Sequence, residues 1–178
     1  RLMDRYLGVV ACWLLTGHRH TVGRLLGRGQ VQPPQAILLI KLWGLGSVLL
    51  TGPVQRALKQ AYPQAKLIFL TFAQNRWAAE ALGLADEVWT IGTRGLLGAL
   101  SDLSTVLRRC RREHVDLALD LEFFSRLPAV LTYLSGAPRR LGYWARGKSC
   151  GDLFTDRCAY NPYRHVTEIF GALAELAG

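Results

Sequence analysis

Three side chains with the chemistry of an active site stand at two points where apolar runs end. Ser47 follows two closely spaced glycines, Gly44 and Gly46, directly after the run "AILLIKL". Glycines at such a turn let the backbone approach a ligand, and the free N–H groups of a following helix would face it. Asp120 and Glu122 stand two positions apart at the end of the run "VDLALDL". That spacing on a strand puts both carboxylates on one face, where either can reach the ligand cleft. Glu122 is the candidate general base, and Asp120 is a candidate for binding the substrate.

Each of these residues also has a structural interpretation. Ser47 is placed to cap the next helix, with its hydroxyl accepting a hydrogen bond from an N–H one turn on. A serine hydroxyl without a partner base stays protonated at neutral pH, so Glu122 is the better candidate for a base. Carboxylates at strand ends are nevertheless often solvated or cap a helix. The spacing of Gly44 and Gly46 matches neither the dinucleotide fingerprint nor a Walker loop.

Basic and hydroxyl side chains near these turns are candidates for binding an anionic substrate. Lys41 ends the first apolar run, Thr51 lies in the predicted helix behind the glycine turn, and Arg139 and Arg140 begin a later run. Guanidinium groups suit the recognition of phosphate or carboxylate. A solvated face explains the two arginines equally well.

Alternating strands and helices must position these residues. The apolar runs are typical of parallel strands covered on both faces, and short connections indicate right-handed βαβ units. The pattern predicts an α/β fold, a doubly wound, Rossmann-like parallel sheet in the order 3-2-1-4-5. Ligands bind beyond the carboxyl ends of such strands, so the turn at 43–47 and the segment 121–124 should lie together there. The predicted strands are 36–42, 66–71, 86–91, 115–121 and 139–144, and the predicted helices are 47–62, 75–84, 95–114, 124–136 and 163–178.

Composition limits the class of partner. The chain has 178 residues and a formal net charge of +9, which suggests a nucleic acid, a phosphorylated sugar or a membrane surface. No nucleic-acid-binding motif is present, so a nucleic acid is not expected. The four cysteines form no CxxC pair, which indicates reduced thiols in the cytoplasm and no zinc site. No metal or other cofactor is predicted.

Residues 1–35 form a separate basic segment, with five arginines against one aspartate. Its apolar run from Tyr6 to Leu15 has ten residues, short of the roughly 20 that span a bilayer. Two interpretations stay open: a segment lying on an anionic membrane surface, or a helix packing its apolar face on the main domain or on a missing one. His18 and His20 are assigned to the basic face rather than to a metal site.

The order and spacing of the segments in residues 36–178 resemble the N-terminal domain of glycosyltransferase family 9, the bacterial lipopolysaccharide heptosyltransferases and their relatives. The resemblance rests on "ILLIKLWGLGSVLLTGPVQRALKQAYPQAKLIFLT", "ADEVWTI", "VDLALDLEFFSR", "LSGAPRRLGYWARG" and "RHVTEIFGALAEL". It implies the N-terminal half of a GT-B fold, which holds the acceptor. A C-terminal half, absent from this chain, would hold the nucleotide-sugar donor.

The resemblance also implies an activity: inverting transfer of a sugar to a lipopolysaccharide core or other cell-envelope glycan. It would take place at the inner face of the cytoplasmic membrane, with peripheral contact to anionic lipid. The fragment alone should be inactive, because the donor half is missing.

The sequence departs from the family at the base. Members that transfer heptose carry an aspartate directly after the glycine turn, where this chain has Ser47, and often glutamine or histidine where it has Glu122. The role of general base would then fall to another carboxylate such as Glu122, to the donor phosphate, or to no group at all. A non-catalytic relative that binds an anionic glycan or lipid is therefore the alternative. A flavodoxin-like or response-regulator module fits the topology but lacks the acidic cluster of such regulators.

Overall fold

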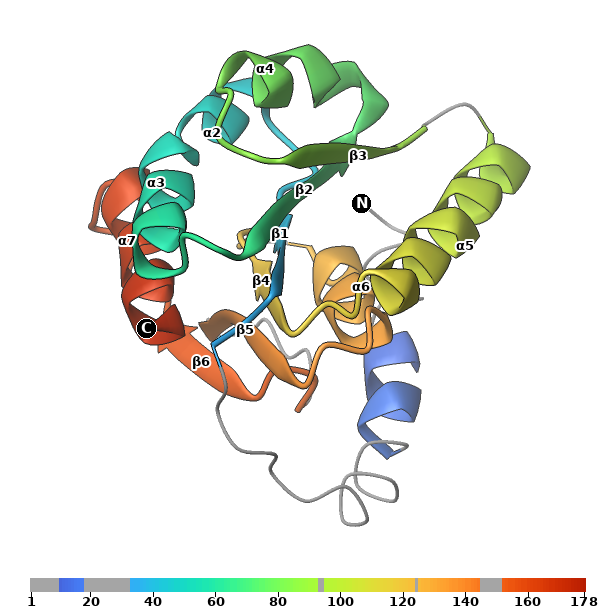
Figure 1. Cartoon of the computed structure of the whole chain (residues 1–178). Coiled ribbons are helices and arrows are strands. Elements are labelled where there is room, and N and C mark those ends of the chain that lie inside the picture. Colours follow the sequence, from blue (N-terminus) through green and yellow to red (C-terminus); the bar gives the residue numbers. More distant parts are fainter. Residues whose placement is uncertain (1–9, 18–32, 93–94, 124, 145–151) are drawn as a thin grey trace.

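The sheet of the protein is parallel throughout. The structure is a computed structural model, and it describes residues 10–17, 33–92, 95–123, 125–144 and 152–178. Its six strands lie in the order β3-β2-β1-β4-β5-β6 (Figure 1). The predicted doubly wound order 3-2-1-4-5 is thereby confirmed and extended by one strand. The strands are β1 Ala36–Ile40, β2 Lys66–Phe72, β3 Glu87–Ile91, β4 Leu117–Asp120, β5 Arg139–Trp144 and β6 Asp156–Ala159.

Helices cover both faces of the sheet (Figure 1). α2, α3, α4 and α7 contribute buried side chains to the core on one face, and α5 and α6 to the core on the other. A short 3₁₀ helix, η1, leads into α4. The helices are α2 Leu45–Leu49, α3 Gly52–Ala61, η1 Ala73–Asn75, α4 Arg76–Ala81, α5 Leu96–Arg112, α6 Leu127–Leu134 and α7 Val166–Ala177.

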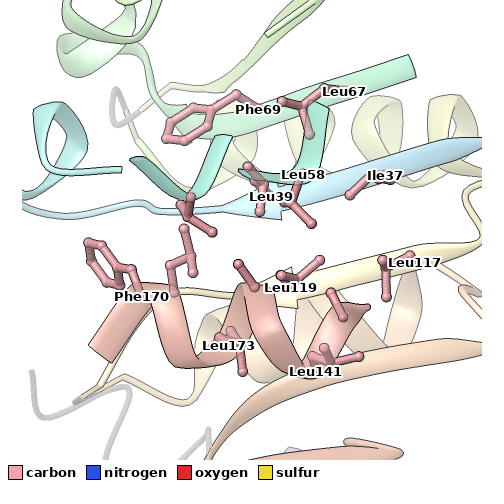
Figure 2. Packing of buried hydrophobic residues seen from close by; sticks show 14 of the residues in the cluster. Ile37, Leu39, Leu58, Leu67, Phe69, Leu117, Leu119, Leu141, Phe170 and Leu173 are labelled. Carbon is pink, nitrogen blue, oxygen red and sulfur yellow. The ribbon is translucent and has the colours of Figure 1, made fainter. Parts of the chain in front are cut away.

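The central strand explains why the first apolar run has no polar interruption. Side chains alternate along β1, so Ile37 and Leu39 join the core under α3 and α7, while Leu38 and Ile40 join the core under α5 and α6. Figure 2 shows the first of these cores, where Phe170 of α7 belongs to the same cluster as Leu39. A strand buried on both faces needs apolar residues at every position.

The helix predicted over 47–62 is divided in two. α2 ends at Leu49, and α3 begins at Gly52 with Pro53 in its first turn. Proline has no N–H to donate, and its ring clashes with the carbonyl four residues back, so a helix that continued from α2 through Pro53 would be kinked or broken. Thr51 lies at the joint, where it is fully buried.

The sixth strand, β6, was not predicted. Its sequence "DRCA" has no apolar run, and its residues alternate between half-buried and exposed. Among the strands that the structure describes, its one partner is β5, at the edge of the sheet. Charged residues are favoured on edge strands because they oppose pairing with other chains, and that same charge conceals the strand from a search for apolar runs.

Residues 10–17 are helical and pack on the main domain. Cys12 is 1% exposed and clusters with Ala129 of α6, Leu153 and Phe154. One side of this helix therefore packs on the main domain, and the choice between the two interpretations of the whole segment stays open. His18, His20 and the arginines of the segment lie outside the described residues, and the boundary at residue 35 stays a prediction. Within the described part of the chain, no helix has the length and apolarity to cross a bilayer.

Candidate functional site

A buried ion pair joins the carboxyl ends of β1 and β4. Lys41 Nζ lies 2.8 Å from Glu122 Oε1, and the two residues are 3% and 6% exposed. The same Oε1 accepts the backbone N–H groups of Leu42, at 3.0 Å, and Trp43, at 2.8 Å. The glycine turn and the segment after β4 therefore meet at one edge of the sheet, as predicted.

Asp120 supports Glu122 from beneath. Asp120 ends β4 beside Ile40, is fully buried, and accepts the backbone N–H of Glu122 through Oδ1 at 2.8 Å. The two predicted carboxylates are thus near each other. Both are buried, and their described contacts are to the backbone and to Lys41, which is the pattern of groups that hold a turn in place.

Asn75 holds the turn from its other side and was not predicted. Its Nδ2 donates to the carbonyl of Leu42 at 2.8 Å. The indole of Trp43 meets the ring of Phe72 edge to face, with centroids 5.1 Å apart. The sequence held a signal that could have identified Asn75. It is a polar amide three residues after β2, and the end of a buried parallel strand lies at the sheet edge where ligands bind.

Ser47 is not an N-cap, contrary to the sequence interpretation. The N-cap of α2 is Gly44, and Ser47 lies inside the helix. Its hydroxyl donates to the carbonyls of Trp43, at 3.0 Å, and Gly44, at 2.8 Å, instead of accepting from an N–H. The helix begins early because Gly44, with φ of 84°, makes the turn itself. A Cβ on Gly44 would stand 2.5 Å from Ser47 Oγ, so the hydroxyl occupies the space that a side chain would need.

The outer surface of the turn is uncharged. Trp43 and Leu45 are 38% and 40% exposed, Gly44 and Gly46 are exposed, and Lys41 is buried beneath them. α2 has only five residues, so its terminus adds little to anion binding and the expected helix-end cradle is weak. The exposed indole of Trp43 offers an apolar ring surface to a ligand at this edge.

Arg139 and Arg140 do not reach this edge, which corrects their assignment to the site. Both begin β5, and the first residues of parallel strands lie at the opposite edge of the sheet from the glycine turn. Arg139 donates to the carbonyls of Leu176 and Ala177 at the end of α7. Arg140 donates to the carbonyls of Ala137 and Leu153. These contacts give both arginines a structural role.

Thr51 is also placed away from the surface of the site. Its hydroxyl donates to the carbonyl of Val48 at 2.6 Å and accepts from Gln55 Nε2 at 2.9 Å. Since the residue is fully buried, these contacts brace the joint between α2 and α3.

Arg126 is the basic residue that follows the carboxyl end of β4. It is half-buried and directly precedes α6. Arg126 was not predicted as a site residue, although "LEFFSR" places an arginine six positions after Asp120, at the edge of the sheet where α/β folds bind ligands. Arg76 follows β2 at the same edge, and its Nε is paired with Glu80 at 2.7 Å.

Comparison with known proteins gives no match to a protein-family model and none to a curated protein. Solved structures do match. The glycosyl transferase family 9 structure from Veillonella parvula DSM 2008 has a TM-score of 0.70 and 21% identity, over 81% of this chain and 41% of that one. The E. coli ADP-heptose lps heptosyltransferase II has a TM-score of 0.62 and 19% identity, over 79% and 40%. The E. coli heptosyltransferase WaaC with ADP has a TM-score of 0.68 and 16% identity, over 79% and 47%.

These matches establish the fold. The chain is similar over about four-fifths of its length to one half of each of these proteins, and it spans less than half of their chains. The structural comparison thus reaches the same group of proteins that the sequence resemblance named. The chain has the Rossmann-like fold of a glycosyltransferase half, with helices on both faces of a parallel sheet.

Proposed function

We propose that this chain is the acceptor-side half of a family 9 glycosyltransferase. The observation that carries the proposal is the match of 81% of the chain to the family 9 structure, at a TM-score of 0.70. The anchored glycine turn at the switch point of the sheet supports it, because this is where α/β folds bind ligands. The activity would be inverting transfer from a nucleotide sugar to a cell-envelope glycan, such as a lipopolysaccharide core.

The acceptor would bind along the edge formed by the glycine turn and the start of α6. Trp43 would contact a sugar ring, and Arg126 would bind an anionic group of the acceptor. The nucleotide-sugar donor would bind to a second half outside this chain. We place the reaction at the inner face of the cytoplasmic membrane.

Glu122 is better suited to positioning than to proton transfer. Its Oε1 already takes three donors, from Lys41 and from the N–H groups of Leu42 and Trp43. A general base must reach the proton of the acceptor hydroxyl, and Glu122 is turned toward the backbone beneath the turn. We therefore propose that Glu122 holds the turn, and that the base comes from the donor phosphate or from the second half.

A second candidate is a non-catalytic relative that binds an anionic glycan or lipid. The lack of an exposed carboxylate among the described residues of the turn favours this candidate. Among the described residues at 41–47 and 120–123, both carboxylates, Asp120 and Glu122, are buried, and Ser47 stands where the resemblance implies an aspartate. Recognition without a base is compatible with this arrangement.

The experiment is a sugar-transfer assay on the longest naturally expressed protein that contains this chain. The substrates are a set of nucleotide sugars and a phosphorylated core oligosaccharide. The glycosyltransferase proposal would be supported if the wild type turns over substrate, Ser47→Ala retains that activity and Ser47→Asp raises it. A gain in Ser47→Asp would also show that position 47 can hold the general base. Binding of the oligosaccharide without turnover in all three proteins would support the non-catalytic relative. Absence of both binding and turnover would contradict both proposals.

A further inference from the structure

The helix at residues 10–17 has two apolar sides, and the domain covers only one. Cys12 is 1% exposed, and Leu15 packs half-buried against the same cluster of Ala129, Leu153 and Phe154. Thr16 directs its hydroxyl to the carbonyl of Cys12, so it adds no polar group to the surface. This inward side fixes the helix on α6, beside which Figure 1 shows it in blue at the periphery of the molecule.

The outward side is a continuous apolar face. Val10, Trp13 and Leu14 are 56%, 79% and 70% exposed, and Gly17 is exposed as well. Their spacing of i, i+3, i+4 and i+7 places them on one side of a helix. No residue from 10 to 17 is charged. A monomeric domain rarely leaves such a face to water unless it contacts a partner.

We propose that this face, defined by Val10, Trp13 and Leu14, docks the protein onto an anionic lipid bilayer. Tryptophan favours the boundary between headgroups and acyl chains, and leucine and valine favour the apolar side of that boundary. The chain carries a net charge of +9, and its sequence has arginines at positions 5 and 19, on either side of the helix. Basic residues next to an inserted apolar face add electrostatic attraction to anionic lipid.

The size of the face favours a bilayer over a second copy of the chain. The face is short, because eight helical residues span about 12 Å. A stable protein interface buries about 1,200 Å² or more in total and therefore needs a larger surface. A bilayer needs only shallow insertion of a few side chains, and so a short face is sufficient. This inference is independent of sugar transfer, and a failure of either leaves the other standing.

The test is co-sedimentation of the 178-residue chain with vesicles of phosphatidylcholine alone and of phosphatidylcholine mixed with phosphatidylglycerol. We expect binding to the anionic vesicles that weakens in high salt, and a loss of about tenfold or more in Trp13→Ser/Leu14→Ser. The matched control is Leu97→Ser/Leu100→Ser, which removes two exposed leucines of α5, 85% and 60% exposed, and should bind as the wild type does. All three proteins should unfold at the same urea concentration, because surface substitutions rarely change stability.

Two results would overturn the inference. One is equal binding of the wild type and Trp13→Ser/Leu14→Ser to anionic vesicles, which would leave the face without a role. The other is absence of vesicle binding together with a dimer in light scattering that Trp13→Ser/Leu14→Ser dissociates. That result would assign the face to a second copy.

Discussion

Lys41 and Glu122, which are 81 positions apart in the sequence, form a buried ion pair of 2.8 Å where β1 and β4 end side by side. The pair lies directly under the glycine turn and holds two of its backbone N–H groups through Glu122. The shape of the candidate site therefore depends on two charges that solvent barely reaches.

Removing one partner of this pair should be more harmful than removing both. Lys41→Met leaves the Glu122 carboxylate buried without its cation, and we expect a loss of about 3–5 kcal/mol in the free energy of unfolding. Lys41→Met/Glu122→Gln leaves no buried charge and should lose less than Lys41→Met alone. Urea unfolding of the two single variants and the double variant gives the coupling. Additive losses would show that the pair does not act as a unit.

Substitution of Gly44 should destabilise the protein, whereas substitution of Gly46 should not. Gly44→Ala places a Cβ 2.5 Å from Ser47 Oγ and keeps a φ of 84°, so it should cost about 1–3 kcal/mol of stability. Gly46 lies inside α2 with open space around it, so Gly46→Ala should be neutral or stabilising by up to about 1 kcal/mol. Thermal unfolding measures both. Gly44→Ala/Ser47→Ala should recover part of the loss, and equal stability of the two alanine variants would contradict the geometry.

Gly142 in β5 should be required for the packing of residues 10–17. A Cβ there would overlap the ring of Phe154, and Phe154 belongs to the cluster that buries Cys12. In Gly142→Ala, the ring must move, and Cys12 should become reactive to a maleimide reagent. Peptide mass spectrometry measures the labelling of each cysteine.

Cys110 is the internal reference for that labelling. It is 1% exposed in the core under α5, and burial raises its pKa to about 11, so it should stay unlabelled in the wild type and in Gly142→Ala. If Cys12 stays equally protected in both proteins, then the packing through Phe154 is not what shields it.

Protonation of the Glu87 carboxylate should lower the free energy of unfolding at acidic pH. The Lys66 ammonium, at 2.7 Å, and the Trp89 indole N–H, at 2.6 Å, both bind its carboxylate, and they lower its pKa from the ordinary value of 4.5. The folded state then binds a proton less readily than the unfolded state. The contribution is therefore present above pH 4.5 and is lost as the pH falls through the lowered value.

Unfolding by urea at a series of acidic pH values tests this contribution. Glu87→Gln should show a shallower decline of stability below pH 4.5 than the wild type. Lys66→Met should show it too, because it removes the main cause of the lowered pKa. Parallel pH profiles for all three proteins would rule out the linkage.

The sequence predicted the parts of the fold where burial leaves a pattern. β1 and β4 are covered on both faces, and their uninterrupted apolar runs were assigned with nearly the observed bounds. β6 was missed because an edge strand has no such run. The break between Leu49 and Gly52 was missed because helical spacing continues through it, although Pro53, which causes the break, was visible in the sequence.

The site was harder to predict than the fold, since side-chain pairing is decided by contacts across the sheet. That Glu122 would lie beside the glycine turn followed from topology. That Lys41 would neutralise it from a neighbouring strand did not, because no local pattern encodes that contact. Arg139 and Arg140 were placed by their chemistry alone, whereas their position at the start of a strand already put them at the far edge of the sheet.

The most direct test of the proposed acceptor site is backbone amide NMR of the isotope-labelled chain during titration with a phosphorylated lipopolysaccharide core oligosaccharide. An acceptor half should bind it at the carboxyl edge, so the largest shifts should fall on Trp43 to Ser47, on Phe123 and on Arg126. Arg126→Gln should weaken binding, whereas the amides of Arg139 and Arg140 should not respond. Shifts confined to the Arg139–Arg140 edge, or an unchanged spectrum at saturating oligosaccharide, would contradict the assignment of this edge as an acceptor site.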